Sequence, residues 1–117
     1  MDQLQLSLLG CLEGPGAVPA SEIAKLRSYR EAVVAAWAHR RIKGMTHATL
    51  AERTGMRPSH ISDYLSTEAH DKNGKERREM PAKYLPAFEA AAGNTFVTQW
   101  LMEQSRKAVQ ESLAAAA

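Results

Sequence analysis

The stretch Thr46-His-Ala-Thr-Leu-Ala-Glu-Arg-Thr-Gly-Met-Arg-Pro-Ser-His-Ile-Ser-Asp-Tyr-Leu-Ser66 decides the fold of this chain. Thr46 is a favourable N-terminal cap and predicts a short helix over residues 47–54. Gly55 ends that helix, because glycine tolerates the positive φ that a helix C-terminus often requires. Pro58 suits the first turn of a helix and predicts a second one over residues 58–65. The stretch therefore predicts two short helices joined by a tight turn.

The apolar residues of this stretch predict how the two helices pack. Leu50 and Ile61 are placed to hold the helices to a common core, and Ala51 is small where the second helix crosses the first. Polar side chains then remain on the outward side of the second helix. They are Arg57, Ser59, His60, Ser62, Asp63 and Ser66.

Upstream, Ser21 is a good cap for a longer helix that ends near Lys43-Gly44. Its apolar positions recur every three or four residues, as an amphipathic helix requires. They are Ile23, Leu26, Tyr29, Val33 and Trp37, and we expect Arg27, Arg30, Glu31 and Arg41 to lie largely off this stripe. Glycines and prolines in residues 13–19 mark a linker, so residues 1–20 are predicted to be an arm. The leucines of the arm fit a strand as well as a helix.

Downstream, residues 66–80 lack apolar periodicity and contain the turn signal Asn73-Gly74, so they predict a polar loop or small wing. Pro81 opens a fourth helix that Gly93 closes. Its apolar stripe is Tyr84, Leu85, Phe88, Ala91 and Ala92. Asn94 or Thr95 caps a fifth helix, with Phe96, Val97, Trp100 and Leu101 facing inward, and its Ala-rich end from residue 107 is expected to fray.

Composition agrees with a single helical domain. The 117 residues can form one modest core, and the aromatic share of 6% with abundant alanine favours helices over strands. The predicted fold is all-α, a five-helix domain over residues 21–113, preceded by the arm of residues 1–20 and followed by a frayed alanine tail of residues 114–117.

Charge is distributed unevenly, although the net charge is only +2. Residues 25–57 hold a cluster of bases and only two acids, Glu31 and Glu52. The bases are Lys25, Arg27, Arg30, Arg40, Arg41, Lys43, Arg53 and Arg57. Such a cluster is typical of a nucleic-acid partner, and equally of a solvated helix face.

Several other chemistries have little support. The single cysteine, Cys11, excludes an internal disulfide, and the four histidines lack metal-ligand spacing. Ser59 and His60 are helix neighbours that point in different directions, so they do not form a nucleophile and its base. We expect no enzyme activity, no cofactor and no metal. The apolar run of residues 4–12 is too short for a membrane span, so the expected location is cytoplasmic.

The pattern Leu50-Ala51, Gly55 and Ile61 resembles the helix-turn-helix of the lambda-repressor-like family, which includes Cro, repressor and XRE-type proteins. The resemblance covers about residues 26–101. The segment Ala82-Lys-Tyr-Leu-Pro-Ala-Phe-Glu-Ala-Ala-Ala-Gly-Asn-Thr95, with Trp100 and Leu101, is similar to the tail of phage CII-type regulators. The resemblance implies that the helix over residues 58–65 enters the major groove of DNA and that the start of the helix over residues 47–54 meets the phosphates.

Carried onto this sequence, the resemblance implies two sets of contacts. Base-reading residues are Arg57, Ser59, His60, Ser62 and Asp63. Backbone-contacting residues are Lys43, Thr46, His47, Thr49, Lys72 and Lys75. His47 stands where the family often has glutamine. Asp63 would repel phosphates unless it accepts a hydrogen bond from cytosine N4 or pairs with a basic side chain such as that of Arg57. Residues 67–80 form a longer connection than is usual in the family and are either a phosphate-touching wing or a solvated loop.

The function implied is that of a sequence-specific, double-stranded-DNA-binding transcriptional regulator, a repressor of the phage or prophage type. One reading helix covers few base pairs, so a homodimer or higher homo-oligomer is expected. Two alternatives remain: an antitoxin or DNA-maintenance factor with the same motif, and a helical adaptor whose helix over residues 58–65 docks a partner protein.

Overall fold

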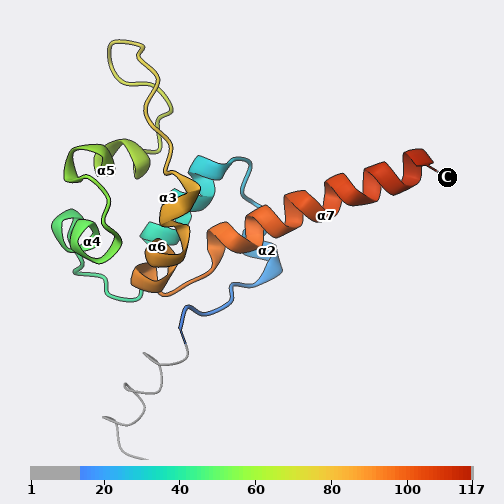
Figure 1. The fold of residues 1–117 in the computed structure, drawn as a ribbon, viewed down its shortest axis with the longest axis horizontal. Helices are drawn as coiled ribbons and strands as arrows, with labels where there is room; N and C mark the ends of the chain where they lie inside the picture. Colours follow the sequence, from blue (N-terminus) through green and yellow to red (C-terminus); the bar gives the residue numbers. More distant parts are fainter. Residues whose placement is uncertain (1–13, 117) are drawn as a thin grey trace, which may run out of the picture.

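The structure, a computed structural model, describes residues 14–116, and these form helices and connecting loops without a β-strand. In chain order the elements are α2 (Ala20–Ile23), α3 (Tyr29–Ala38), α4 (His47–Thr54), α5 (Pro58–Tyr64), the 3₁₀ turn η1 (Ala82–Tyr84), α6 (Leu85–Ala92) and α7 (Phe96–Ala116). The predicted all-α class is confirmed. Figure 1 shows α4 and α5 at one end of the body and the free end of α7 at the other.

The upstream helix is not one helix, contrary to the prediction. The chain leaves the helical path after Ile23, and α3 begins anew at Tyr29, because the Ser28 hydroxyl accepts a hydrogen bond from the Glu31 amide at 3.1 Å. Ser28 and Glu31 have the Ser-x-x-Glu spacing that typically marks a helix start. The helix also ends earlier than predicted, at Ala38, where the Asn94 side chain donates to the carbonyls of Ala36 and His39.

Both short helices lie where the sequence predicts them. Thr46 caps α4 by accepting from the Thr49 amide at 3.2 Å, and Gly55 ends it in the left-handed region with φ of 78°. Pro58 occupies the first turn of α5, whose helix stops at Tyr64, one residue before the predicted end. The local capping signals were therefore sufficient to place this part of the chain.

Downstream, the predicted loop and both later helices are present, with two differences. Pro81 leads first into the 3₁₀ turn η1 and only then into α6, which Gly93 closes with φ of 80°. The last helix, α7, is 21 residues long and continues through Ala116, although we expected its end to fray. No helix within residues 14–116 has both the length and the apolar character needed to cross a membrane.

The described part of the arm is attached to the body. Gly16 exchanges backbone hydrogen bonds with Gly93 and Thr95, and Val18 exchanges two with the Gln99 side chain, at 2.7 and 2.8 Å. Residues 16–18 thereby run beside the start of α7. The prediction for residues 1–13 lies outside the described residues.

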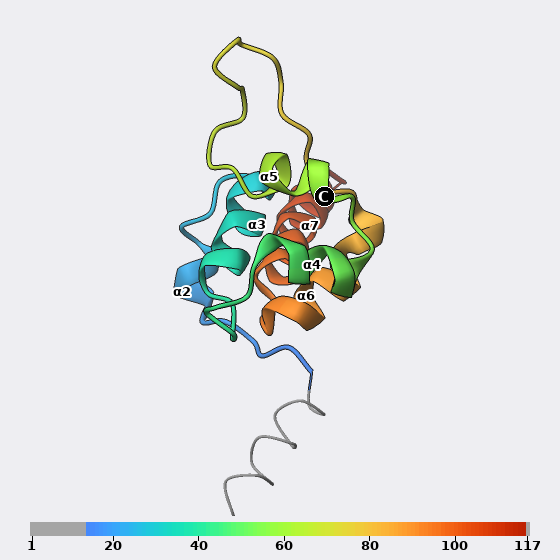
Figure 2. The same cartoon turned by 90° about the vertical axis from the view of Figure 1, so that its left-hand side faces the viewer.

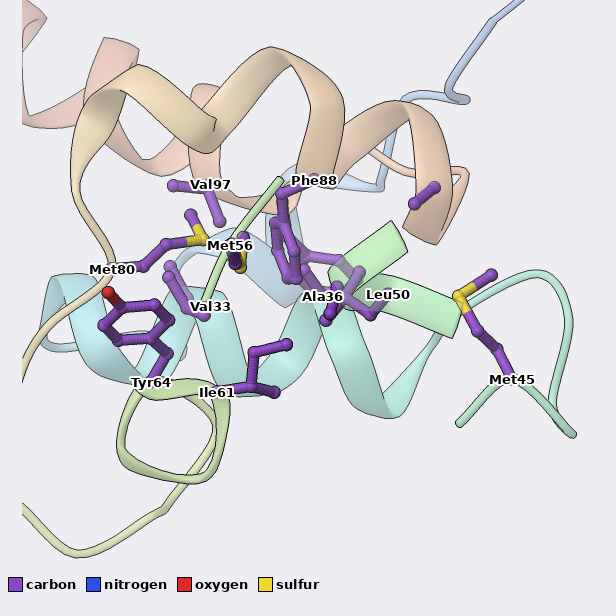
Figure 3. Packing of buried hydrophobic residues seen from close by; sticks show 14 of the residues in the cluster. Val33, Ala36, Met45, Leu50, Met56, Ile61, Tyr64, Met80, Phe88 and Val97 are labelled. Atoms are coloured by element: carbon purple, nitrogen blue, oxygen red, sulfur yellow. The ribbon is translucent and has the colours of Figure 1, made fainter. Parts of the chain in front are cut away.

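The hydrophobic core joins helices from both halves of the sequence. Its largest fully buried side chains are Val33 from α3, Leu50 from α4, Ile61 from α5, Phe88 from α6 and Val97 from α7. Figure 3 shows Leu50 and Phe88 side by side next to Ala36, with Ile61 close by in the same cluster. Because Leu50 and Ile61 insert into the core that α3 and α6 provide, the relative placement of α4 and α5 is fixed by packing.

Candidate nucleic-acid interface

The turn between α4 and α5 is held by a small polar network. The Thr54 hydroxyl donates to the Leu50 carbonyl at 2.6 Å and accepts from the Met56 amide at 3.3 Å. Met56 is buried beneath the turn, and Ala51 is buried between the helices. The direction in which α5 points is thus determined by a rigid turn as well as by the core.

Three exposed side chains lie along the outward side of α5, namely Ser59 and Ser62 on the helix and Arg57 at its N-cap position. His60 is half-buried, and its ring lies edge-on to Tyr64 with centroids 6.2 Å apart. The Tyr64 hydroxyl lies 3.5 Å from His60 Nδ1, which keeps the imidazole close to the helix. Of the five predicted base-reading residues, these three are therefore exposed to solvent and His60 is partly exposed.

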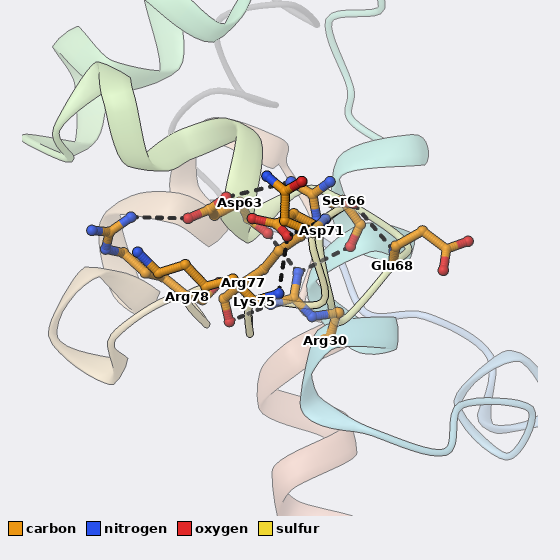
Figure 4. Close-up of polar contacts among 9 residues, drawn as sticks. Arg30, Asp63, Ser66, Glu68, Asp71, Lys75, Arg77 and Arg78 are labelled. Atoms are coloured by element: carbon orange, nitrogen blue, oxygen red, sulfur yellow. Dashed lines mark hydrogen bonds and ion pairs between the residues drawn. The ribbon is translucent and has the colours of Figure 1, made fainter.

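Asp63, the fifth, is engaged within the protein. Its carboxylate accepts from Arg78 at 3.0 Å and from Arg77 at 3.4 Å, rather than from Arg57 (Figure 4). Partial burial raises the pKa of this carboxyl, but the hydrogen bonds and positive charges of Arg78 and Arg77 outweigh burial and lower the pKa below its usual value. The ion pairs tie α5 to the end of the following loop.

This pairing predicts a pH-dependent contribution to stability. Because the pKa of Asp63 is lowered by folding, its contribution is complete above the unfolded-state pKa and is lost as pH falls through the folded-state pKa. We expect Asp63→Asn to melt below the wild type at pH 7 and the difference to narrow between about pH 5 and pH 3. Thermal unfolding followed by circular dichroism at each pH measures this difference in melting temperature.

The matched control is Asp71→Asn. Asp71 Oδ1 accepts from the amides of Asn73 and Lys75, and an asparagine oxygen can accept both bonds, so we expect a small difference from wild type at every pH. A constant gap between wild type and Asp63→Asn down to pH 3 would show that the ion pairs do not stabilise the fold.

Arg30 is the residue that sequence reasoning misplaced. It was expected off the apolar stripe, yet its side chain is buried, and its guanidinium donates to four backbone carbonyls. Asp63 and Ser66 provide two of them at the end of α5, and Arg77 and Arg78 provide the others (Figure 4). Its spacing from Leu26 and Val33 places it on the stripe, which was the available signal.

The loop of residues 67–79, which we call the projecting loop, extends from the body beyond α5 (Figure 2). Its two arms approach at Asp71 and Lys75 and again at Ala69 and Arg77, where backbone hydrogen bonds are 2.9 and 2.8 Å long. Gly74 turns the chain with φ of 80°, as the Asn73-Gly74 signal predicted. The exposed Lys72 and Lys75 lie at the tip.

The predicted backbone-contacting residues at the start of α4 are close together. Lys43, Thr46 and His47 are exposed and Thr49 is half-buried. His47 packs edge-on against Trp37, with ring centroids 5.7 Å apart. The Arg40 guanidinium lies over the same Trp37 ring, with its Cζ 4.2 Å from the ring centroid, and it donates to the Lys43 carbonyl at 2.7 Å. The approach to α4 is therefore an ordered, basic segment.

Residues 14–116 contain no group of three histidine, cysteine or acidic side chains that could hold a metal ion. The predicted contact residues lie at one end of the body, on or next to α4, α5 and the projecting loop. Comparison with protein-family models, with curated proteins and with solved structures finds no match to the chain.

Proposed function

We propose that this protein is a sequence-specific, double-stranded-DNA-binding regulator in which α5 reads base edges. The observation that carries the proposal is the set of exposed polar side chains along α5, namely Ser59 and Ser62 with Arg57 at the N-cap position, on a helix whose opposite side is buried in the core. Arginine and serine side chains are common donors to bases in the major groove. The groove is about 12 Å wide and admits an α-helix.

The neighbouring cations supply the sequence-independent part of this binding. Lys43 lies before α4, and Lys72 and Lys75 lie at the tip of the projecting loop. Positive side chains on either side of a reading helix neutralise phosphates and release counterions, which makes the affinity dependent on salt. The helix-turn-helix of the lambda-repressor-like family uses the same division between reading and holding, and repressor activity of the phage type stays a prediction from that resemblance.

The proposal is tested by selecting from a library of random duplexes with the full chain and then measuring affinity. We expect enrichment of a defined sequence, bound about 10³-fold or more tightly than its scrambled form, with affinity falling steeply as salt rises. Failure to enrich any sequence, together with equal affinity for both duplexes, would contradict sequence-specific reading. If the chain binds no duplex specifically but binds one partner protein, the adaptor alternative is favoured.

A further inference from the structure

Helix α7 is longer than the body against which it packs. Phe96 and Val97 are buried, and Trp100 Nε1 donates to the Leu26 carbonyl at 3.1 Å. Every residue from Ser105 to Ala116 is exposed, and Figure 1 shows this half of the helix extending away from the other helices. An isolated helical segment of this length is marginal in water unless one side packs against something.

The free half carries an apolar row. Met102, Val109 and Leu113 are 64%, 58% and 67% exposed. Their spacings of seven and four residues place them on one side of the helix, while Lys107 and Glu111 lie on the other. This is an unpartnered amphipathic helix whose apolar side is uncovered in the single chain.

A shallow, mainly apolar recess adjoins the same row. It lies where α7 passes the start of α6, and its lining residues are Leu85, Thr98, Leu101, Met102, Ser105, Arg106 and Val109. The body therefore ends in a recess, and the free half of α7 continues as a ridge. A recess and a ridge on one helix can complement each other across a two-fold axis.

We propose that α7 pairs antiparallel with α7 of a second copy, so that Val109 of each chain packs against Met102 of the other. In that register Leu113 lies opposite Thr98 and enters the recess beside Leu85 and Leu101. The small Ser105 falls at the centre of the crossing, where the two helix backbones approach most closely. Each of these contacts then occurs twice in the dimer, because a two-fold axis relates the two copies.

Antiparallel pairing fits better than parallel pairing because of where the bodies lie. Parallel helices would bring both bodies to the same end and would place Leu113 against Leu113, leaving the recess uncovered. Charge does not oppose self-pairing, since residues 101–116 hold two bases and two acids, Arg106, Lys107, Glu103 and Glu111. Arg106 is already paired with Glu103 at 2.6 Å beside the apolar row. A net charge of zero avoids repulsion between identical surfaces.

Pairing through α7 does not require DNA, although it also bears on the proposed function. The free end of α7 points away from α4 and α5 in Figure 1. Pairing there leaves the outward side of α5 accessible in both copies, and a dimer with two reading helices addresses a two-part site.

The first experiment measures the mass of the full chain by light scattering over a concentration series, without DNA. We expect a dimer for the wild type, and at least a ten-fold higher dissociation constant for Leu113→Glu and for Val109→Glu. Ala115→Glu, on the opposite side of the same turn of α7, is the matched control and is expected to dimerise as the wild type does. Circular dichroism checks that each variant keeps its helices. A monomeric wild type overturns the proposal.

The second experiment tests the register by disulfide formation in a Cys11→Ser background, which removes the chain's single native cysteine. Oxidising a mixture of Met102→Cys and Val109→Cys chains should link one of each. Either variant alone should stay unlinked, because like positions lie about 10 Å apart along the helix axis, beyond disulfide reach.

Two further outcomes would contradict the proposal, each in a distinct way. Linking of each variant with itself indicates parallel helices. A dimer that survives Leu113→Glu but is lost on deleting residues 1–13 identifies the N-terminal segment as the occupant of the recess. Loss of DNA recognition with the dimer intact would refute the proposed function and leave this inference standing.

Discussion

Replacing Arg30 by methionine is expected to lower the free energy of unfolding by about 3 kcal/mol, the scale for removing a charged donor from buried acceptors. The Arg30 side chain is 6% exposed and donates to carbonyls of Asp63, Ser66, Arg77 and Arg78. Methionine fills a similar length of space but donates nothing. The carbonyls at the end of α5 and at the base of the projecting loop would then lose their shared partner.

Urea unfolding followed by circular dichroism measures this effect, and Arg27→Met is the matched control. Arg27 is exposed and lies three residues earlier, so its replacement is expected to change stability by less than about 0.5 kcal/mol. Arg30→Lys should recover only part of the loss, because an ammonium group cannot reach four acceptors in the plane that a guanidinium spans. Equal stability of Arg30→Met and wild type would show that water replaces the guanidinium at little cost.

The accuracy of the sequence predictions follows the range of the interactions involved. Thr46, Gly55 and Pro58 act on the backbone within four residues of themselves, so the bounds of α4 and α5 could be predicted closely. The break before α3 was also encoded locally, by Ser28 and Glu31. It was missed because the apolar spacing continues across residues 24–28 as if a single helix passed through them.

The contacts of Arg30 and Asp63 could not be predicted in the same way. Arg30 meets carbonyls that lie 33 to 48 residues later, and Asp63 meets arginines 14 and 15 residues later. Local pattern indicates that one position is on an apolar stripe and the other on a polar face, but it does not specify which long-range partner arrives. The path of the projecting loop decides the partners of Asp63 and two of the four contacts of Arg30, and that path depends on the completed core.

Substitutions on the outward side of α5 give the sharpest test of what that helix does. On the proposed function, Arg57→Ala and Ser62→Ala should each weaken binding to the selected duplex by about 1–3 kcal/mol and relax the preferred base at one position. Both side chains are exposed, so neither change should lower the melting temperature appreciably. Binding to scrambled duplexes should change little, apart from the loss of one positive charge at Arg57.

Lys43→Ala provides the contrast, because Lys43 lies before α4 and not on α5. It should weaken binding to every duplex and reduce the slope of log affinity against log salt by about one unit, as loss of a single phosphate contact does. The two classes of variant therefore differ in kind: one changes which sequence is preferred, and the other changes how strongly any sequence is held. If Arg57→Ala and Ser62→Ala leave both the affinity and the preferred sequence unaltered while Lys43→Ala still lowers the salt slope, the protein holds DNA without reading it through α5.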